Sequence, residues 1–286
     1  MRILRPLMDL IVYIIFSTCG DIYMSRRRTI LKSKNMMEIS DHMPGNSVVR
    51  KHGRRVRSKK EKVTPEAMRK NNLRIARRKL RLLIDNNFNA GDYYLTLTFK
   101  ERLSIDEVKD CIRKFNRRLR GLYQKANIEL KYLYVMEGKI RFHFHMLINQ
   151  GIQISPILLK ELWPHGYTKI ELYRGEAEDA INLANYFLKE KEMAIDKASQ
   201  AELMKQKWVS SKNLVKPEEE KKILTASEWR KEIQVPKGYY LDTDSVYGGV
   251  NNFGYPFRTY RLIKLQDWRE VREKRKSTKA LSILRE

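Results

Sequence analysis

The segment KYLYVMEGKIRFHFHMLI, residues 131–148, contains two runs of β-branched and aromatic residues with a short polar break between them. Runs of this composition are typical of strands, so we predict one strand over 131–136 and another over 141–148. Glu137, Gly138 and Lys139 form the break and predict a turn. Two strands joined this closely pair with each other, so the segment predicts an antiparallel hairpin.

A helix, a strand and a second helix are predicted before this hairpin. Thr64 followed by Pro65 is typical of a helix start, with an N-cap residue and proline at the first helical position. Residues 93–99 are rich in β-branched and aromatic residues and predict a buried strand. The capping box Ser104-Ile-Asp-Glu107 predicts a second helix that runs to about Tyr123.

Three further elements are predicted after the hairpin. We expect a short helix from Ser155-Pro156 to near Trp163, a strand over 167–173 and a helix from about Ala177 to Glu192. The order is therefore helix, strand, helix, hairpin, helix, strand, helix. This order predicts an α+β fold with a central antiparallel β-sheet and helices packed mainly on one face.

The two ends of the chain have a different composition. Residues 1–23 form an apolar leader; we expect translation to begin at Met24, and the alternative is a cleaved signal or a membrane anchor. Residues 24–63 predict a basic flexible arm, and 64–192 the ordered domain. Residues 193–286 predict a mostly helical extension with a late strand at about 255–263.

The charge balance indicates a polyanionic partner. The chain has 59 Lys and Arg against 34 Asp and Glu, a formal net charge of +25. Such an excess favours nucleic acid, although a merely basic or ribosome-associated protein would share it. Cys19 and Cys111 are the two cysteines, too few for a disulfide framework, which fits a reducing cytoplasm.

His143 and His145 are the first candidate functional residues. Side chains at positions i and i+2 of a strand share one face, so both imidazoles can reach one cation. Glu137, just across the hairpin turn, supplies a carboxylate. Two imidazoles and one carboxylate suit Mn²⁺ or Mg²⁺ and leave coordination positions for a substrate. The alternative is a pair of ordinary surface histidines.

Tyr186 and Lys189 are the second candidate pair. At helical spacing i and i+3 they would project from the same face. A tyrosine hydroxyl, with a reference pKa near 10, becomes a useful nucleophile when nearby positive charge favours the phenolate. The alternative is a packed aromatic residue beside a solvated lysine.

Three motifs in this order resemble those of a known family. Tyr94–Phe99, Glu137 with His143–His145, and Tyr186–Lys189 resemble the three motifs of rolling-circle replication initiators of the His-hydrophobe-His (HUH) endonuclease superfamily, found in plasmids and filamentous phages. The turn Leu162–Gly166 is also similar to the family's. The resemblance covers about residues 90–192, so 64–192 is identified as an HUH nicking and ligation domain with an RRM-like sheet.

The resemblance implies a chemistry and a set of partners. Tyr186 would attack a phosphodiester in single-stranded or hairpin origin DNA, forming a 5′-phosphotyrosine and a free 3′-hydroxyl. His143, His145 and Glu137 would hold the metal, and Lys189 would orient the phosphate. A host polymerase would extend the 3′ end. We expect a host helicase too, because the sequence has no G-x-x-x-x-G-K-[ST] loop. Such a protein would be cytoplasmic, without stable membrane association.

Two alternatives remain open on the sequence. A single-tyrosine transposase of the same superfamily would use the same chemistry on the ends of a mobile element. A non-catalytic DNA- or RNA-binding protein would need the positive charge but neither the histidines nor Tyr186.

Overall fold

The computed structural model describes residues 26–43, 64–138, 141–151, 153–189, 208–224, 232–250 and 255–265. The apolar leader, Met24, the basic cluster at 50–60 and the C-terminal tail lie outside these ranges. The chain divides into two compact units. We call them the strand unit (Met1–Leu31, Glu38–Lys62 and Glu219–Leu262) and the mixed unit (Lys32–Met37, Val63–Glu218 and Ile263–Glu286).

The mixed unit contains a five-stranded sheet in the order β6-β3-β5-β4-β7. Each neighbouring pair is antiparallel, and the hairpin predicted from residues 131–148 is the β4–β5 pair. The predicted α+β class is therefore confirmed. The strands are β3 (Tyr93–Thr98), β4 (Tyr132–Glu137), β5 (His143–Ile148), β6 (Thr168–Leu172) and β7 (Val209–Ser210).

The helices of this unit begin at the residues that the sequence indicates. The Thr64 side chain accepts a hydrogen bond from the Ala67 N–H at the start of α2. Ser104 and Glu107 form the capping box of α3, and the Ser155 side chain caps α4. The helices are α2 (Pro65–Asn87), α3 (Ile105–Lys125), α4 (Pro156–Glu161) and α5 (Ala177–Phe187).

One face of the sheet forms the main hydrophobic core. Every second side chain of β3 is buried on this face, as a period of two requires, and it packs against the inner stripe of α3. Burying one such side chain contributes about 1.5–3 kcal/mol to folding. The α3 residues predicted to face inward are all buried, namely Val108, Ile112, Phe115 and Leu119.

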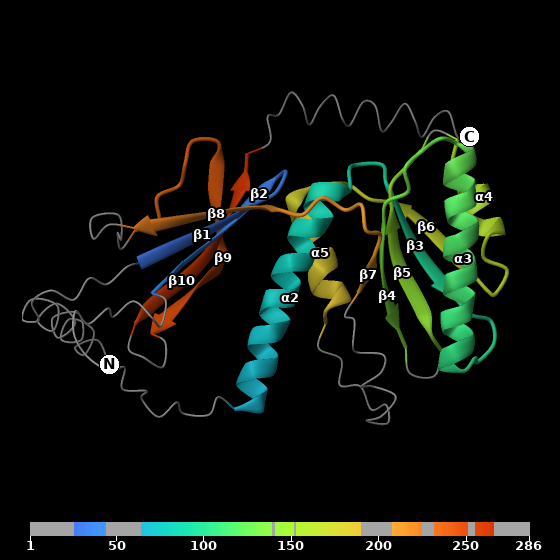
Figure 1. The fold of residues 1–286 in the computed structure, drawn as a ribbon, viewed down its shortest axis with the longest axis horizontal. Helices are drawn as coiled ribbons and strands as arrows, with labels where there is room; N and C mark the ends of the chain where they lie inside the picture. The colour runs from blue at the N-terminus through green and yellow to red at the C-terminus, as the bar shows by residue number, and fades with distance from the viewer. Residues whose placement is uncertain are drawn as a thin grey trace, which may run out of the picture. The chain divides into compact units, whose positions relative to one another are not determined.

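The other face of the sheet carries the histidines and is covered by α5. Phe144 belongs to the α3 core, so its neighbours His143 and His145 point to the opposite face. There His145 contacts Tyr186 of α5. Figure 1 shows α3 and α5 on opposite sides of this sheet. The helices therefore cover both faces, whereas the sequence pattern had favoured mainly one.

Helix α5 is shorter than predicted. It ends at Phe187 rather than near Glu192, because Leu188 leaves the helical conformation with φ −110° and ψ 32°. The Lys189 N–H donates to the Tyr186 carbonyl at 3.2 Å in the closing turn. Arg77 of α2 donates from Nε and Nη2 to the Leu188 carbonyl at 3.2 and 2.9 Å. This guanidinium satisfies a carbonyl at the helix end, where positive charge is favourable.

A second five-stranded sheet, in the order β8-β1-β2-β10-β9, belongs mainly to the strand unit. The prediction of a flexible arm over 24–63 is therefore wrong for residues 26–42, which form two strands. The prediction of a mostly helical extension is wrong for the described residues beyond 208, although the late strand is confirmed. The strands are β1 (Arg26–Lys32), β2 (Met36–His42), β8 (Glu218–Leu224), β9 (Tyr239–Val250) and β10 (Pro256–Lys264).

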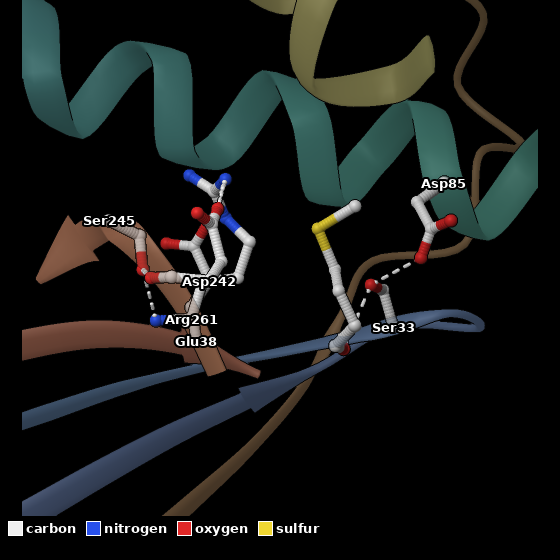
Figure 2. Close-up of polar contacts among 7 residues, drawn as sticks. Ser33, Glu38, Asp85, Asp242, Ser245 and Arg261 are labelled. Atoms are coloured by element: carbon white, nitrogen blue, oxygen red, sulfur yellow. Dashed lines mark hydrogen bonds and ion pairs between the residues drawn. The ribbon is translucent and has the colours of Figure 1, made fainter. Parts of the chain in front are cut away.

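Buried ion pairs explain why charged segments form this sheet. Asp41 is fully buried and accepts from Arg28 at 2.6 Å and from Arg258 at 2.9 Å. Arg261 donates to Glu38 at 3.2 Å and to Asp242 at 2.6 Å, as Figure 2 shows. A buried charge is tolerated when it is paired and hydrogen-bonded. Here the partners lie on strands from distant parts of the sequence.

The turn between β1 and β2 is held by a buried carboxylate of α2. Asp85 accepts hydrogen bonds from the Ser33 hydroxyl at 2.6 Å (Figure 2) and from the backbone and side-chain nitrogens of Asn35, both at 2.8 Å. All three residues belong to the mixed unit.

Candidate metal and nucleophile site

The β4–β5 hairpin brings the three predicted metal ligands together. Glu137 lies directly opposite His143 in the register, and His145 lies two residues further on the same face. Glu137 Oε2 is 3.3 Å from His143 Nε2 and 3.5 Å from His145 Nε2. The ligand atoms of all three lie within 4.8 Å of one another. This cluster could hold a metal ion.

The burial of the cluster favours a cation. Glu137 is only 7% exposed and His145 only 6%, whereas His143 is half-buried. A buried carboxylate costs free energy unless positive charge balances it. Two imidazole nitrogens with one carboxylate form a donor set that suits a divalent transition metal such as Mn²⁺. The residues present therefore fit the group that the sequence predicted.

Tyr186 approaches the cluster from α5. Its hydroxyl lies 3.2 Å from His145 Nε2, and the two rings pack edge to face with centroids 5.1 Å apart. The residue is 41% exposed, so the hydroxyl is both next to the cluster and open to a substrate. Partial burial and the negative charge of Glu137 raise the pKa of Tyr186 above its usual value. A cation at the cluster would offset the second of these causes.

Tyr94 and Thr96 contact the same imidazole from the other side. The Tyr94 hydroxyl is 2.8 Å from His145 Nδ1, and Thr96 Oγ1 is 3.3 Å from it. Burial raises the pKa of Tyr94 far above its usual value. The first motif contained both residues, but sequence reasoning assigned them no role. The signal was the alternation in β3, which separates them from buried Leu95 and Leu97 and puts them on the histidine face.

Lys189 is not placed as helical spacing predicted. Helix α5 ends at Phe187, so the i and i+3 relation to Tyr186 does not extend to residue 189. Lys189 is exposed beyond the helix end. Its role toward the phosphate stays a prediction.

The turn Leu162–Gly166 supports the end of β3 and does not enter the cluster. Trp163 is buried in the core, and its Nε1 donates to the Thr98 carbonyl at 2.8 Å. Gly166 approaches that carbonyl so closely that an added Cβ would lie 2.3 Å from it. Trp163 is therefore a core residue and not an exposed platform for a base.

The comparisons with known proteins agree with the motifs. Residues 92–191 match a family of replication-associated proteins, described by its member ORF2, which confirms the resemblance to such proteins and links this region to replication initiation. A solved structure, the hypothetical protein ORF119 from Sulfolobus islandicus rod-shaped virus 1, has a TM-score of 0.32 and 20% identity, covering 42% of this chain and 97% of that chain. A likeness at that score carries no argument. A search of the curated proteins found no match.

Within the described ranges, no helix combines the length and the apolar character needed to cross a lipid bilayer.

Proposed function

We propose that this protein nicks and rejoins single-stranded DNA at a specific site through a 5′-phosphotyrosine and thereby initiates rolling-circle replication of a plasmid or phage. One observation carries the proposal. The exposed hydroxyl of Tyr186 lies 3.2 Å from a nitrogen of the cluster formed by Glu137, His143 and His145. A nucleophile next to a cation site is the arrangement that phosphoryl transfer requires.

The proposed reaction needs no nucleotide cofactor. The Tyr186 oxygen bonds to the scissile phosphorus and its proton passes to solvent, while the bond from phosphorus to the 3′ oxygen breaks and that oxygen takes up a proton. A divalent cation held by the cluster would stabilise the charge on the phosphate oxygens. Rejoining is the reverse, because a 3′-hydroxyl can attack the phosphotyrosine and free the tyrosine.

The chain's own residues would prepare this step. Arg77 anchors the end of α5 and so holds Tyr186 over the sheet. The net charge of +25 would attract the DNA strand. Lys189, just beyond α5, would contact a phosphate of the bound strand. Single-stranded or hairpin origin DNA, a host helicase and a host polymerase are the partners in this proposal.

Covalent adduct formation tests the proposal. The protein is incubated with Mn²⁺ and labelled single-stranded oligonucleotides that tile its replicon's candidate origin, and products are separated on a denaturing gel. We expect wild type to give cleavage and a slow-migrating adduct, and Tyr186→Phe to give neither. Tyr167→Phe is the matched control, because its side chain is 71% exposed and belongs to the turn before β6.

Two outcomes would contradict the proposal. If wild type cleaves no oligonucleotide of the origin, the protein is a DNA-binding factor without this activity. If Tyr186→Phe still forms the adduct, another residue is the nucleophile. Cleavage of mobile-element ends in place of an origin would identify a transposase that uses the same site.

A further inference from the structure

The imidazole of His145 lies between two tyrosines, one at each nitrogen. Nε2 faces the cluster, 3.5 Å from Glu137 Oε2 and 3.2 Å from the Tyr186 hydroxyl. Nδ1 faces away from it, 2.8 Å from the Tyr94 hydroxyl and 3.3 Å from Thr96 Oγ1. A neutral imidazole has a proton on one nitrogen and a lone pair on the other, and the partners decide which is which.

The cluster needs the lone pair on Nε2. His143 and His145 both direct Nε2 toward the same carboxylate oxygen of Glu137, so these two nitrogens are the ones that can bind a shared cation. The proton of neutral His145 must then lie on Nδ1, where it needs an acceptor. Metal-binding histidines generally donate their second ring N–H in this way, which fixes both the tautomer and the ring orientation.

We propose that Tyr94 is the positioning residue of this site: its hydroxyl accepts the Nδ1–H of His145 and so keeps the Nε2 lone pair directed at the cation. This inference rests on the metal site of the proposed function. It assigns a task to the tyrosine of the first motif, which contacts neither the cation nor the DNA phosphate in this scheme.

Two further observations favour Tyr94 over Thr96 as the acceptor. The Tyr94 hydroxyl is the nearer oxygen, and its ring lies almost parallel to the imidazole, at an interplanar angle of 5° and a centroid distance of 5.8 Å. The Tyr94 ring also stacks against Phe187 at 6.3 Å. Phe187 follows Tyr186 directly, so a single side chain contacts both a metal ligand and the last residue of the nucleophile's helix.

The test compares Tyr94→Phe with wild type by two measurements that need no DNA. The first is Mn²⁺ affinity by titration calorimetry, and the second is the tautomer of His145 in metal-free protein by ¹⁵N NMR. The variant keeps the ring and removes only the hydroxyl. We expect Mn²⁺ to bind about 10- to 100-fold more weakly, as for other lost partners of a ligating histidine. We also expect the Nδ1–H tautomer to dominate in wild type and to lose that dominance in the variant.

Two control variants separate this role from a general effect on the strand. Tyr93→Phe removes the neighbouring buried hydroxyl, which donates to the Ile154 carbonyl on the opposite face, and should leave both readouts unchanged. Thr96→Val removes the more distant oxygen and should have the smaller effect. A melting curve for each variant checks that it is folded.

Each outcome decides a separate claim. An Nε2–H tautomer in wild type overturns the inference without any variant. Equal Mn²⁺ affinity and tautomer in wild type and Tyr94→Phe also overturn it, while the metal site itself survives. A larger effect of Thr96→Val than of Tyr94→Phe would overturn it by making Thr96 the acceptor. If wild type binds no Mn²⁺, the metal site of the proposed function fails.

Discussion

The two sheets of this protein bury carboxylates in different company. In the strand unit, Asp41 lies between Arg28 and Arg258, whose guanidinium groups keep their positive charge at any ordinary pH. In the mixed unit, Glu137 lies against His143 and His145, which are charged only when protonated. The first arrangement is complete within the protein and stabilises a fold. The second favours an added cation and therefore marks a site.

Replacing Asp41 should show the largest effect of this difference. Asp41→Asn leaves two guanidinium groups without their buried carboxylate, so we expect the strand unit to lose about 3–5 kcal/mol of stability. Urea unfolding followed by circular dichroism measures the loss. Glu219→Gln in the same unit removes an exposed pair with Lys221, and we expect it to cost less than about 1 kcal/mol. Equal effects of the two variants would show that burial does not distinguish them.

Replacing Glu137 should affect metal binding and spare the fold. We expect Glu137→Gln to weaken Mn²⁺ binding by at least about 100-fold, because losing a ligand should cost no less than losing a partner of one. Without metal, the variant should be as stable as wild type or more stable, since the amide removes a buried charge. Calorimetry and urea unfolding measure the two effects. A loss of several kcal/mol in metal-free protein would make Glu137 a structural residue like Asp41.

Alkaline pH should give the smallest effect, in the mixed unit. Burial raises the pKa of Tyr134 to about 12. In the unfolded chain a tyrosine ionises near pH 10, so the contribution is complete below about pH 10 and is lost as the pH rises toward 12. We expect a loss of about 1 kcal/mol by pH 11 from this residue.

Tyr134→Phe isolates that contribution. Its urea midpoint should fall less between pH 8 and pH 11 than that of wild type, whereas Tyr167→Phe, with an exposed ring, should follow wild type. Parallel pH profiles for Tyr134→Phe and wild type would contradict the assignment.

The mixed unit could be predicted largely because its signals are local. The period of two in β3 and β5, the capping box at Ser104 and the spacing of His143 and His145 all lie within short segments. The end of α5 could not be predicted, because residues 189–192 alternate Lys and Glu, which are good helix formers. Tertiary contacts override such weak preferences, and here Arg77 satisfies the last carbonyl from α2.

The strand unit could not be predicted because its signals are distant in sequence. Charged residues in β1 and β2 indicated a solvated arm, since isolated charges are seldom buried. Their partners are contributed by β10, at a sequence separation of 217 for Asp41 and Arg258 and of 223 for Glu38 and Arg261. No pattern within a short window reveals pairs at that separation. The same limit hid the contact of Arg77 with Leu188, which are 111 residues apart.

The short span of the ligand cluster has a consequence for the energetics of folding. Glu137 and His143 are six residues apart, so an unfolded chain can bring them together at a small loss of loop entropy. A cation that binds the unfolded chain as well stabilises the native state by less than its affinity suggests. Tyr186, 41 residues from His145, reaches the cluster only in the folded domain. Metal capture and nucleophile placement would therefore be separable, with only the second depending on the whole fold.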